Sequence, residues 1–194
     1  MNFKAKSVLA LVLAITIAAT GCSAQWITVA LQDLPVLTQM ALNIATLVSA
    51  LASGQQASTA DVAVIQNISA QASRDLNLLQ TLYNDYKANP STTTLQNIEN
   101  AIADLNQNLP ALLQSAHISN PTLSARIAAA VNLILTTVNS FASLMPQTTQ
   151  MTARKAPAAQ LLHSTDLKKE WNQQVCAPTG NPALDAAFAA SMLR

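Results

Sequence analysis

Apolar residues recur every three or four positions along four stretches of the chain between residues 35 and 145. This period places them on one face of a helix, whereas a strand would alternate every second residue. The pattern therefore predicts four amphipathic helices. Their apolar faces consist, in chain order, of Leu37, Met40, Ile44, Leu47 and Leu51; Val62, Ile65, Ser69, Ala72, Leu76, Leu79, Tyr83 and Tyr86; Leu95, Ile98, Ile102, Leu105, Leu109 and Leu112; and Leu123, Ile127, Ala130, Ile134, Thr137, Phe141 and Leu144.

Helix start and stop signals flank these stretches. Asp33 followed by Pro35 predicts the start of the first helix, and Gly54 predicts its end. Ser58 with Asp61 three residues later is a capping-box variant that predicts the start of the second helix. Asn120-Pro121 predicts the start of the fourth helix in the same way.

Short connections between long helices favour antiparallel neighbours. We therefore predict an all-α fold, an antiparallel up-and-down four-helix bundle over residues 34–145. After Pro146 the periodicity fades into Thr, Gln, Pro and Ala, which predicts a surface linker over residues 147–164. Two short helices, over about residues 165–175 and 182–193, are expected to complete a C-terminal extension.

The N-terminus has the features of a secretion signal. Lys4 and Lys6 precede an uncharged apolar run over residues 8–19, which breaks at small residues before Cys22. A membrane-spanning helix needs about 20 apolar residues, so a run of roughly a dozen is too short for a stable anchor. The sequence therefore predicts export followed by cleavage.

The tetrapeptide Ala19-Thr20-Gly21-Cys22 resembles the lipobox of bacterial lipoproteins, although Ala19 stands where that family most often has leucine. The resemblance implies that residues 1–21 are removed and that a diacylglyceryl group is attached to Cys22. Residues 22–33 would then be a lipidated lead-in. Ser23 would direct the protein to the outer membrane rather than the inner one. Several acyl chains, each burying methylenes at ~0.8 kcal/mol, would hold it durably.

An alternative cleavage leaves a different protein. Ordinary signal peptidase could also cut after Gly21 or after Ala24, which would leave a secreted bundle without lipid. Cleavage after Gly21 would keep Cys22 in the chain, and Cys22 and Cys176 could then form a disulfide in an oxidising compartment. Lipidation would instead leave Cys176 as a lone thiol near a flexible tail, open to alkylation or to an intermolecular disulfide.

Charge is scarce in this chain. Charged residues make up 10% of it and the net charge is +1, against about 25% charged residues in a typical soluble domain. A nucleic-acid-binding protein usually carries a concentrated basic face, so that partner is not expected. The polar faces of the second and third helices are built from uncharged amides: Gln66, Asn67, Gln71, Asn77, Gln80 and Asn84, then Gln96, Asn97, Asn100, Asn106 and Gln107.

Patterns that carry catalytic or cofactor chemistry are missing from the sequence. A di-iron bundle needs several inward glutamates, but only Glu99 and Glu170 occur. A haem attachment motif, a zinc-protease motif, a nucleophile elbow and a glycine-rich phosphate loop are also absent. Cys176 with His163 and Asp166 is the one conceivable catalytic grouping. We predict no enzyme activity and no cofactor or metal site.

These observations favour a membrane-anchored lipoprotein of the cell envelope, facing the periplasm, that acts as a structural or interaction module. Its partners would be membrane lipid through acylated Cys22, and an unknown protein or a second copy of the chain. A first alternative is a carrier that holds an apolar ligand or cofactor inside the bundle. Trp26 fits either the headgroup layer or the end of the bundle. A weaker alternative, insertion of the first and fourth helices into the membrane, is opposed by Asn43 and Asn132.

Overall fold

The fold is all-α across the part of the chain that the structure describes. The computed structural model describes the backbone of residues 3–53, 57–146 and 163–194, and the side chains of residues 26–52, 57–146 and 163–194. Within these ranges there are six helices and no strand. The helices are α1 (Phe3–Ser53), α2 (Thr59–Ala88), α3 (Thr92–Ser115), α4 (Pro121–Ser143), α5 (Ser164–Gln174) and α6 (Pro182–Ala190).

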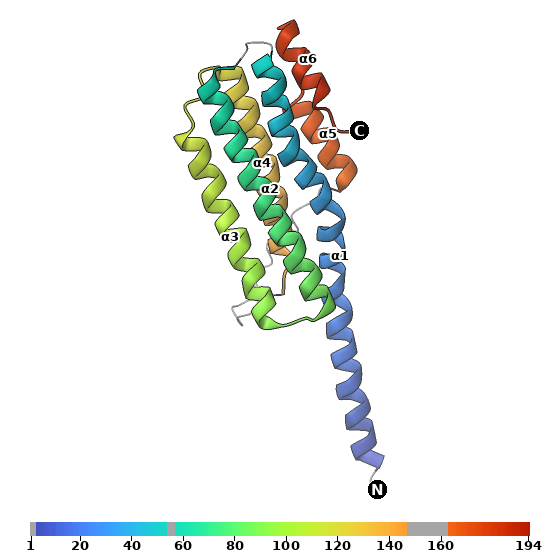
Figure 1. The fold of residues 1–194 in the computed structure, drawn as a ribbon. Helices are drawn as coiled ribbons and strands as arrows, with labels where there is room; N and C mark the ends of the chain where they lie inside the picture. The colour runs from blue at the N-terminus through green and yellow to red at the C-terminus, as the bar shows by residue number, and fades with distance from the viewer. Residues whose placement is uncertain (1–2, 54–56, 147–162) are drawn as a thin grey trace.

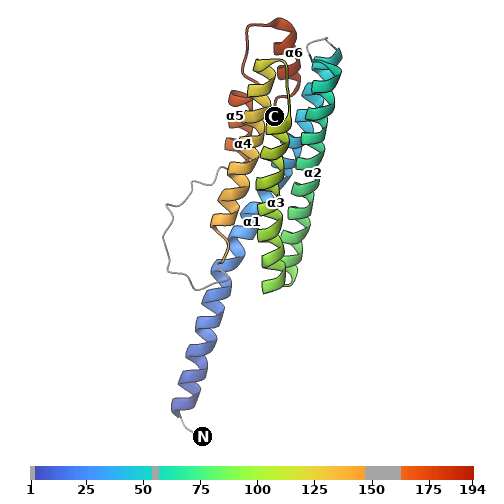
Figure 2. The same cartoon turned by 90° about the vertical axis from the view of Figure 1, so that its left-hand side faces the viewer.

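The first four helices lie side by side (Figures 1 and 2). Helix α1 packs against α2 and α4, and α3 packs against the same two helices. Helices α5 and α6 lie against α1, and α5 also contacts α4. We call residues 26–52 of α1 together with α2–α6 the helical body. The N-terminal part of α1 projects from one end of this body (Figure 1).

The predicted apolar faces form the core. All of their members are buried except Val62, Tyr86, Leu112 and Leu144, which are partly buried. Each exception lies close to a helix end, where neighbouring helices cover a residue on fewer sides. Ser69 is buried because α1 and α2 approach closely at this point, and its hydroxyl donates to the Ala41 carbonyl oxygen at 2.6 Å.

The predicted caps of α2 and α4 are confirmed. Ser58 and Asp61 form a reciprocal capping box at the start of α2. Asn120 accepts from the Leu123 backbone N–H at 3.1 Å at the start of α4. Asp61 also accepts from the Ser119 backbone N–H at 3.0 Å, so one carboxylate ties the α3–α4 connection to α2. Burial alone would raise the pKa of Asp61, but these hydrogen bonds lower it below its ordinary value.

The predicted start of the first helix is wrong. Helix α1 runs through Asp33 and contains Pro35 in its interior. An interior proline costs ~3 kcal/mol. However, Trp26, Ile27 and Leu34, which precede Pro35 in the helix, are all buried. Each buried apolar side chain contributes roughly 1.5–3 kcal/mol to stability. This burial outweighs the cost of the proline, and residues 22–33 are therefore helical.

The C-terminal helices agree with their predicted positions within a few residues. Helix α5 begins at Ser164, and α6 begins at Pro182 after the Asn181 cap. The predicted linker over residues 147–164 lies almost entirely outside the described residues, as does the predicted stop at Gly54. Gly180, in the connection between α5 and α6, has φ +82°, a backbone conformation that L side chains rarely adopt.

Candidate functional site

Cys22, the predicted lipid attachment point, lies on α1 four residues before the buried Trp26. Residues 3–21, the bulk of the predicted signal peptide, lie on the projecting part of the same helix (Figures 1 and 2). The side chain of Cys22 is outside the described residues. The described core begins with Trp26, which is 5% exposed.

Trp26 packs at the end of the helical body from which α1 projects. Its ring meets Tyr83 edge-on at 5.6 Å between centroids, and it lies 6.0 Å from the Tyr86 ring. Such aromatic pairs contribute ~0.5–1.5 kcal/mol beyond their burial. Of the two interpretations offered by the sequence, the structure places the indole in the core at the bundle end. Trp26 Nε1 and Tyr83 Oη are buried without a hydrogen-bond partner among the described residues, and burial raises the pKa of Tyr83.

Asp33 caps a helix, although not the helix that the sequence predicted. This carboxylate on α1 is 2% exposed and accepts from the backbone N–H of Ser164, the first residue of α5. His163, at the N-cap position of α5, makes no capping hydrogen bond of its own. Burial raises the pKa of Asp33, against the opposing charge of His163 and the Ser164 hydrogen bond. Asp33 thus fixes α5 to α1.

The last residues of the chain form an extended segment held by side chains of α1 and α5. The Ser191 carbonyl oxygen accepts from Asn43 Nδ2 at 3.1 Å and from Trp171 Nε1 at 2.9 Å. Asn172 pairs with both the N–H and the carbonyl of Leu193, each at 2.9 Å. These anchoring roles of Asn43, Trp171 and Asn172 were not predicted, because a contact across 148 positions leaves no local sequence signal.

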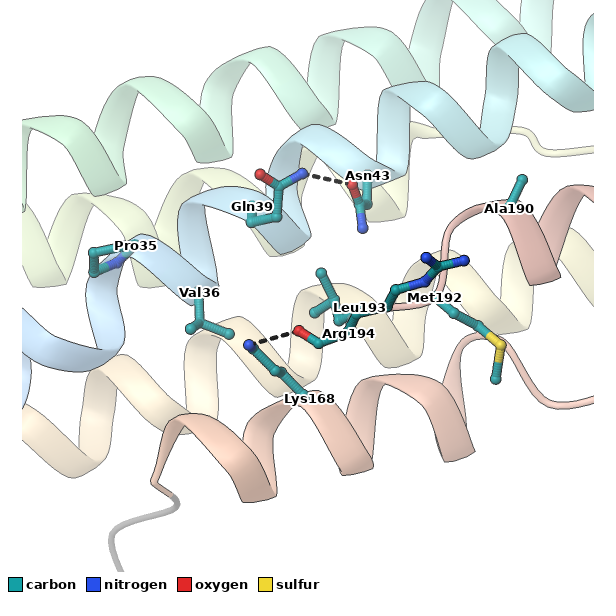
Figure 3. A pocket seen from close by; sticks show the side chains of 9 residues that line it. All are labelled: Pro35, Val36, Gln39, Asn43, Lys168, Ala190, Met192, Leu193 and Arg194. Atoms are coloured by element: carbon teal, nitrogen blue, oxygen red, sulfur yellow. Dashed lines mark hydrogen bonds between the residues drawn. The ribbon is translucent and has the colours of Figure 1, made fainter.

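A pocket of about 390 Å³ opens beside this segment (Figure 3). One wall is the outer face of α1, with Val36 and the hydrogen-bonded pair Gln39–Asn43. The opposite wall contains Leu193 and Lys168, whose Nζ donates to the Arg194 carbonyl oxygen at 2.7 Å. The pocket is a hollow on the surface of the body and not a cavity among the apolar faces of α1–α4.

A second hollow of about 360 Å³ lies between α2 and α3. Its lining consists of Gln71, Asn108, Ala111, Leu112 and Ser115, a mixture of polar and apolar side chains. The alternative function, a carrier of an apolar ligand, needs an apolar space inside the bundle. Neither of these two hollows lies inside the bundle.

The exposure of Cys176 differs from the predicted one. It is 4% exposed and packs beside Trp171, so the expectation of an accessible thiol near a flexible tail is wrong. Burial raises the pKa of this thiol to about 11, against smaller lowering effects of Trp171 and Arg126. Arg126 holds the neighbouring loop in place, donating to the Gln174 and Ala177 carbonyl oxygens and lying 5.8 Å from the Phe188 ring centroid.

The grouping of Cys176 with His163 and Asp166 is not assembled. The histidine precedes the first residue of α5 and the cysteine follows its last, so about 15 Å of helix separates them.

His117 is exposed, and its Nδ1 lies 3.1 Å from the Ser115 carbonyl oxygen near the end of α3. Among the residues that the structure describes, no three metal-ligating side chains gather.

The geometry of α1 also opposes a disulfide between Cys22 and Cys176. Along this helix Cys22 lies about 30 Å from Asn43. Cys176 lies near the Asn43 level, because its N–H donates to Trp171 O and the Trp171 indole shares the Ser191 carbonyl with Asn43. A disulfide requires Cα atoms about 4.4–6.8 Å apart.

Two segments of the described chain, Trp26–Ala52 and Pro121–Ser143, are long and apolar enough to cross a membrane. About half of each lies buried inside the body, as expected for core helices of a packed domain. Length and composition alone therefore do not favour membrane insertion.

No protein-family model matches the chain, and no curated protein or solved structure matches it.

Proposed function

We propose that this protein is an exported lipoprotein, cleaved before Cys22 and lipidated there, whose helical body acts by association. The observation that carries the proposal is the position of Cys22. Residues 3–21 lie on the part of α1 that projects from the body, and Trp26, four residues after Cys22, is buried. Cleavage before Cys22 therefore removes a segment that projects from the body.

We further infer that α1–α4 form an antiparallel up-and-down four-helix bundle. Each helix packs against its predecessor, and α4 packs against α1, which closes the ring of four. The connections between α2 and α3 and between α3 and α4 are short, which favours antiparallel neighbours.

Replacement of Cys22 tests the anchor, and the second cysteine of the chain supplies a matched control. In cells fed labelled palmitate, the wild-type protein and the Cys176→Ala variant should both carry label and sediment with membranes. The Cys22→Ala variant should lose the label and leave the membrane fraction. Equal labelling of Cys22→Ala and wild type would contradict lipidation at this residue.

Association rather than catalysis is supported by the surfaces of α2 and α3. All of the amide residues that the sequence predicted for these faces are exposed or partly exposed. Uncharged amides lose less free energy on desolvation than charged groups, and interface cores are depleted in Lys, Glu and Asp. Some of them already make hydrogen bonds within the body. Asn106 and Asn139 exchange hydrogen bonds of 2.7 and 2.9 Å between α3 and α4, and Gln71 and Gln96 donate to Asp75 and Asn100 within their own helices.

Crosslinking in the native membrane tests this association. Lysine at the exposed positions Asn77 and Asn100, on α2 and α3, should abolish one specific crosslinked species while the helical circular dichroism spectrum is unchanged. Lysine at Gln32, exposed on α1, is the control and should leave that species intact. A wild-type protein that yields only monomer in every crosslinking condition would contradict the association.

A further inference from the structure

We propose that the helical body stands end-on on the membrane, with the end that contains Trp26 against the lipid headgroups. The inference rests on the proposed lipidation of Cys22 and adds the surface that faces the bilayer. Only three residues, 23–25, separate the anchor from Trp26. The four Cα-to-Cα steps span about 6 Å as helix and at most about 14 Å when fully extended. In either conformation, the Trp26 end of the body is held next to the membrane.

The direction of α1 sets the orientation of the body. This helix is continuous from Phe3 to Ser53, and its projecting part extends along the long dimension of the body (Figures 1 and 2). Helix α2, with 30 residues, gives that dimension a length of about 45 Å. After cleavage, residues 22–25 remain of the projecting part. A flat-lying body would require this turn of helix to bend sharply or unwind, whereas the end-on arrangement keeps it helical.

The chemistry of this end suits the headgroup layer. The α2–α3 connection and the C-terminal end of α4 lie at the same end of the body as the projecting helix (Figures 1 and 2). In residues 83–93 and 142–146 the charged residues are Asp85 and Lys87 alone, so little charge must be desolvated there. The exposed ammonium of Lys87 can meet anionic headgroups, and partly exposed Tyr86 has the apolar ring and polar tip found at membrane interfaces.

The long sides of the body lack the apolar face that a flat-lying helix needs. Leu42, Leu78 and Met192 are the large apolar side chains exposed in the described chain, and they belong to α1, α2 and the C-terminal segment respectively. Apart from Pro35 and Leu42, the exposed residues in the described part of α1 carry hydroxyl or amide groups: Thr28, Gln32, Gln39, Thr46 and Ser49. The surface best suited to contact the lipid bilayer is therefore the end of the body and not its long sides.

Neutron reflectometry on the lipidated protein, reconstituted in a supported bilayer of phosphatidylcholine and phosphatidylglycerol, tests this orientation without any substitution. The end-on body should give a protein layer about 45 Å thick above the headgroups, whereas a flat body would give about 20–25 Å, two helix diameters. A thin layer that survives a high-salt wash would overturn the orientation and leave the anchor standing. Loss of the layer in the wash would overturn the anchor and the orientation together.

Lysine labelling tests the contact surface itself. With an amine-reactive reagent added outside phosphatidylcholine–phosphatidylglycerol vesicles, Lys87 should be labelled several-fold more slowly in the anchored protein than in detergent. Lys169, exposed on α5, is the matched control and should be labelled equally in both states. Unchanged labelling of Lys87 would overturn its contact with the headgroups.

Discussion

Replacement of Asp33 tests how the C-terminal helices are fixed to α1. This buried carboxylate affects the stability of the fold in two opposing ways. It stabilises the fold by accepting a hydrogen bond from the first N–H of α5, and it destabilises the fold because its charge is desolvated. Asparagine keeps an acceptor of the same shape without the charge, whereas alanine removes the acceptor. We therefore expect Asp33→Asn to be at least as stable as wild type at pH 7. Asp33→Ala should be less stable than Asp33→Asn by about 1 kcal/mol, the usual value of an N-cap.

The difference in stability between Asp33→Asn and wild type should depend on pH in one direction. Because the folded-state pKa of Asp33 is raised above its ordinary value of 3.8, protonation of Asp33 favours the folded state. Its contribution to stability is complete below pH 3.8 and is lost as the pH rises through the folded-state pKa. The stability of Asp33→Asn relative to wild type should therefore increase between pH 3 and pH 7.

Urea unfolding followed by circular dichroism at a series of pH values measures this difference as a shift of the midpoint. Asp104→Asn, the same change at an exposed position on α3, controls for the loss of one negative charge. A stability difference between Asp33→Asn and wild type that shrinks as the pH rises would refute the argument, because it would mean that the fold favours the charged carboxylate.

Three further predictions follow from buried groups. Leu76→Ala should lower the free energy of unfolding by about 2–5 kcal/mol, whereas Leu78→Ala, at a half-exposed position, should change it by about 0.5 kcal/mol or less in urea titrations. Asp61→Ala should cost about 1–3 kcal/mol at pH 7, and this cost should shrink as the pH falls below 3.8, because the folded-state pKa is lowered. In the Cys22→Ala chain, Cys176 should resist a thiol reagent until urea unfolds the protein; rapid native reaction would contradict its burial.

Local sequence signals predicted the helices well where each signal acts on its own helix. The period of the apolar residues identified the buried faces of α1–α4, since it depends only on helix geometry and burial. The Ser58 and Asn120 caps act within three residues, so they were also visible in the sequence.

Signals that act between distant segments were misassigned. Asp33 before Pro35 has the pattern of a local helix start, but its carboxylate caps α5, some 130 positions later. The extension of α1 upstream of Asp33 has no local sequence signal, because the burial of Trp26, Ile27 and Ala30 that offsets the interior proline depends on tertiary packing. Cys176 was expected to be accessible because the packing of Trp171 and Arg126 around it depends on tertiary contacts. The candidate site at Cys22 rests on the sequence alone.

The intact mass of the protein purified from membranes measures the chemical state of Cys22 in one experiment. A lipoprotein should give a chain that begins at Cys22 and carries the added mass of a diacylglyceryl group on that residue, with Cys176 as a free thiol. A chain with an unmodified Cys22, or with two hydrogens missing because Cys22 and Cys176 are joined, would contradict the proposed lipidation.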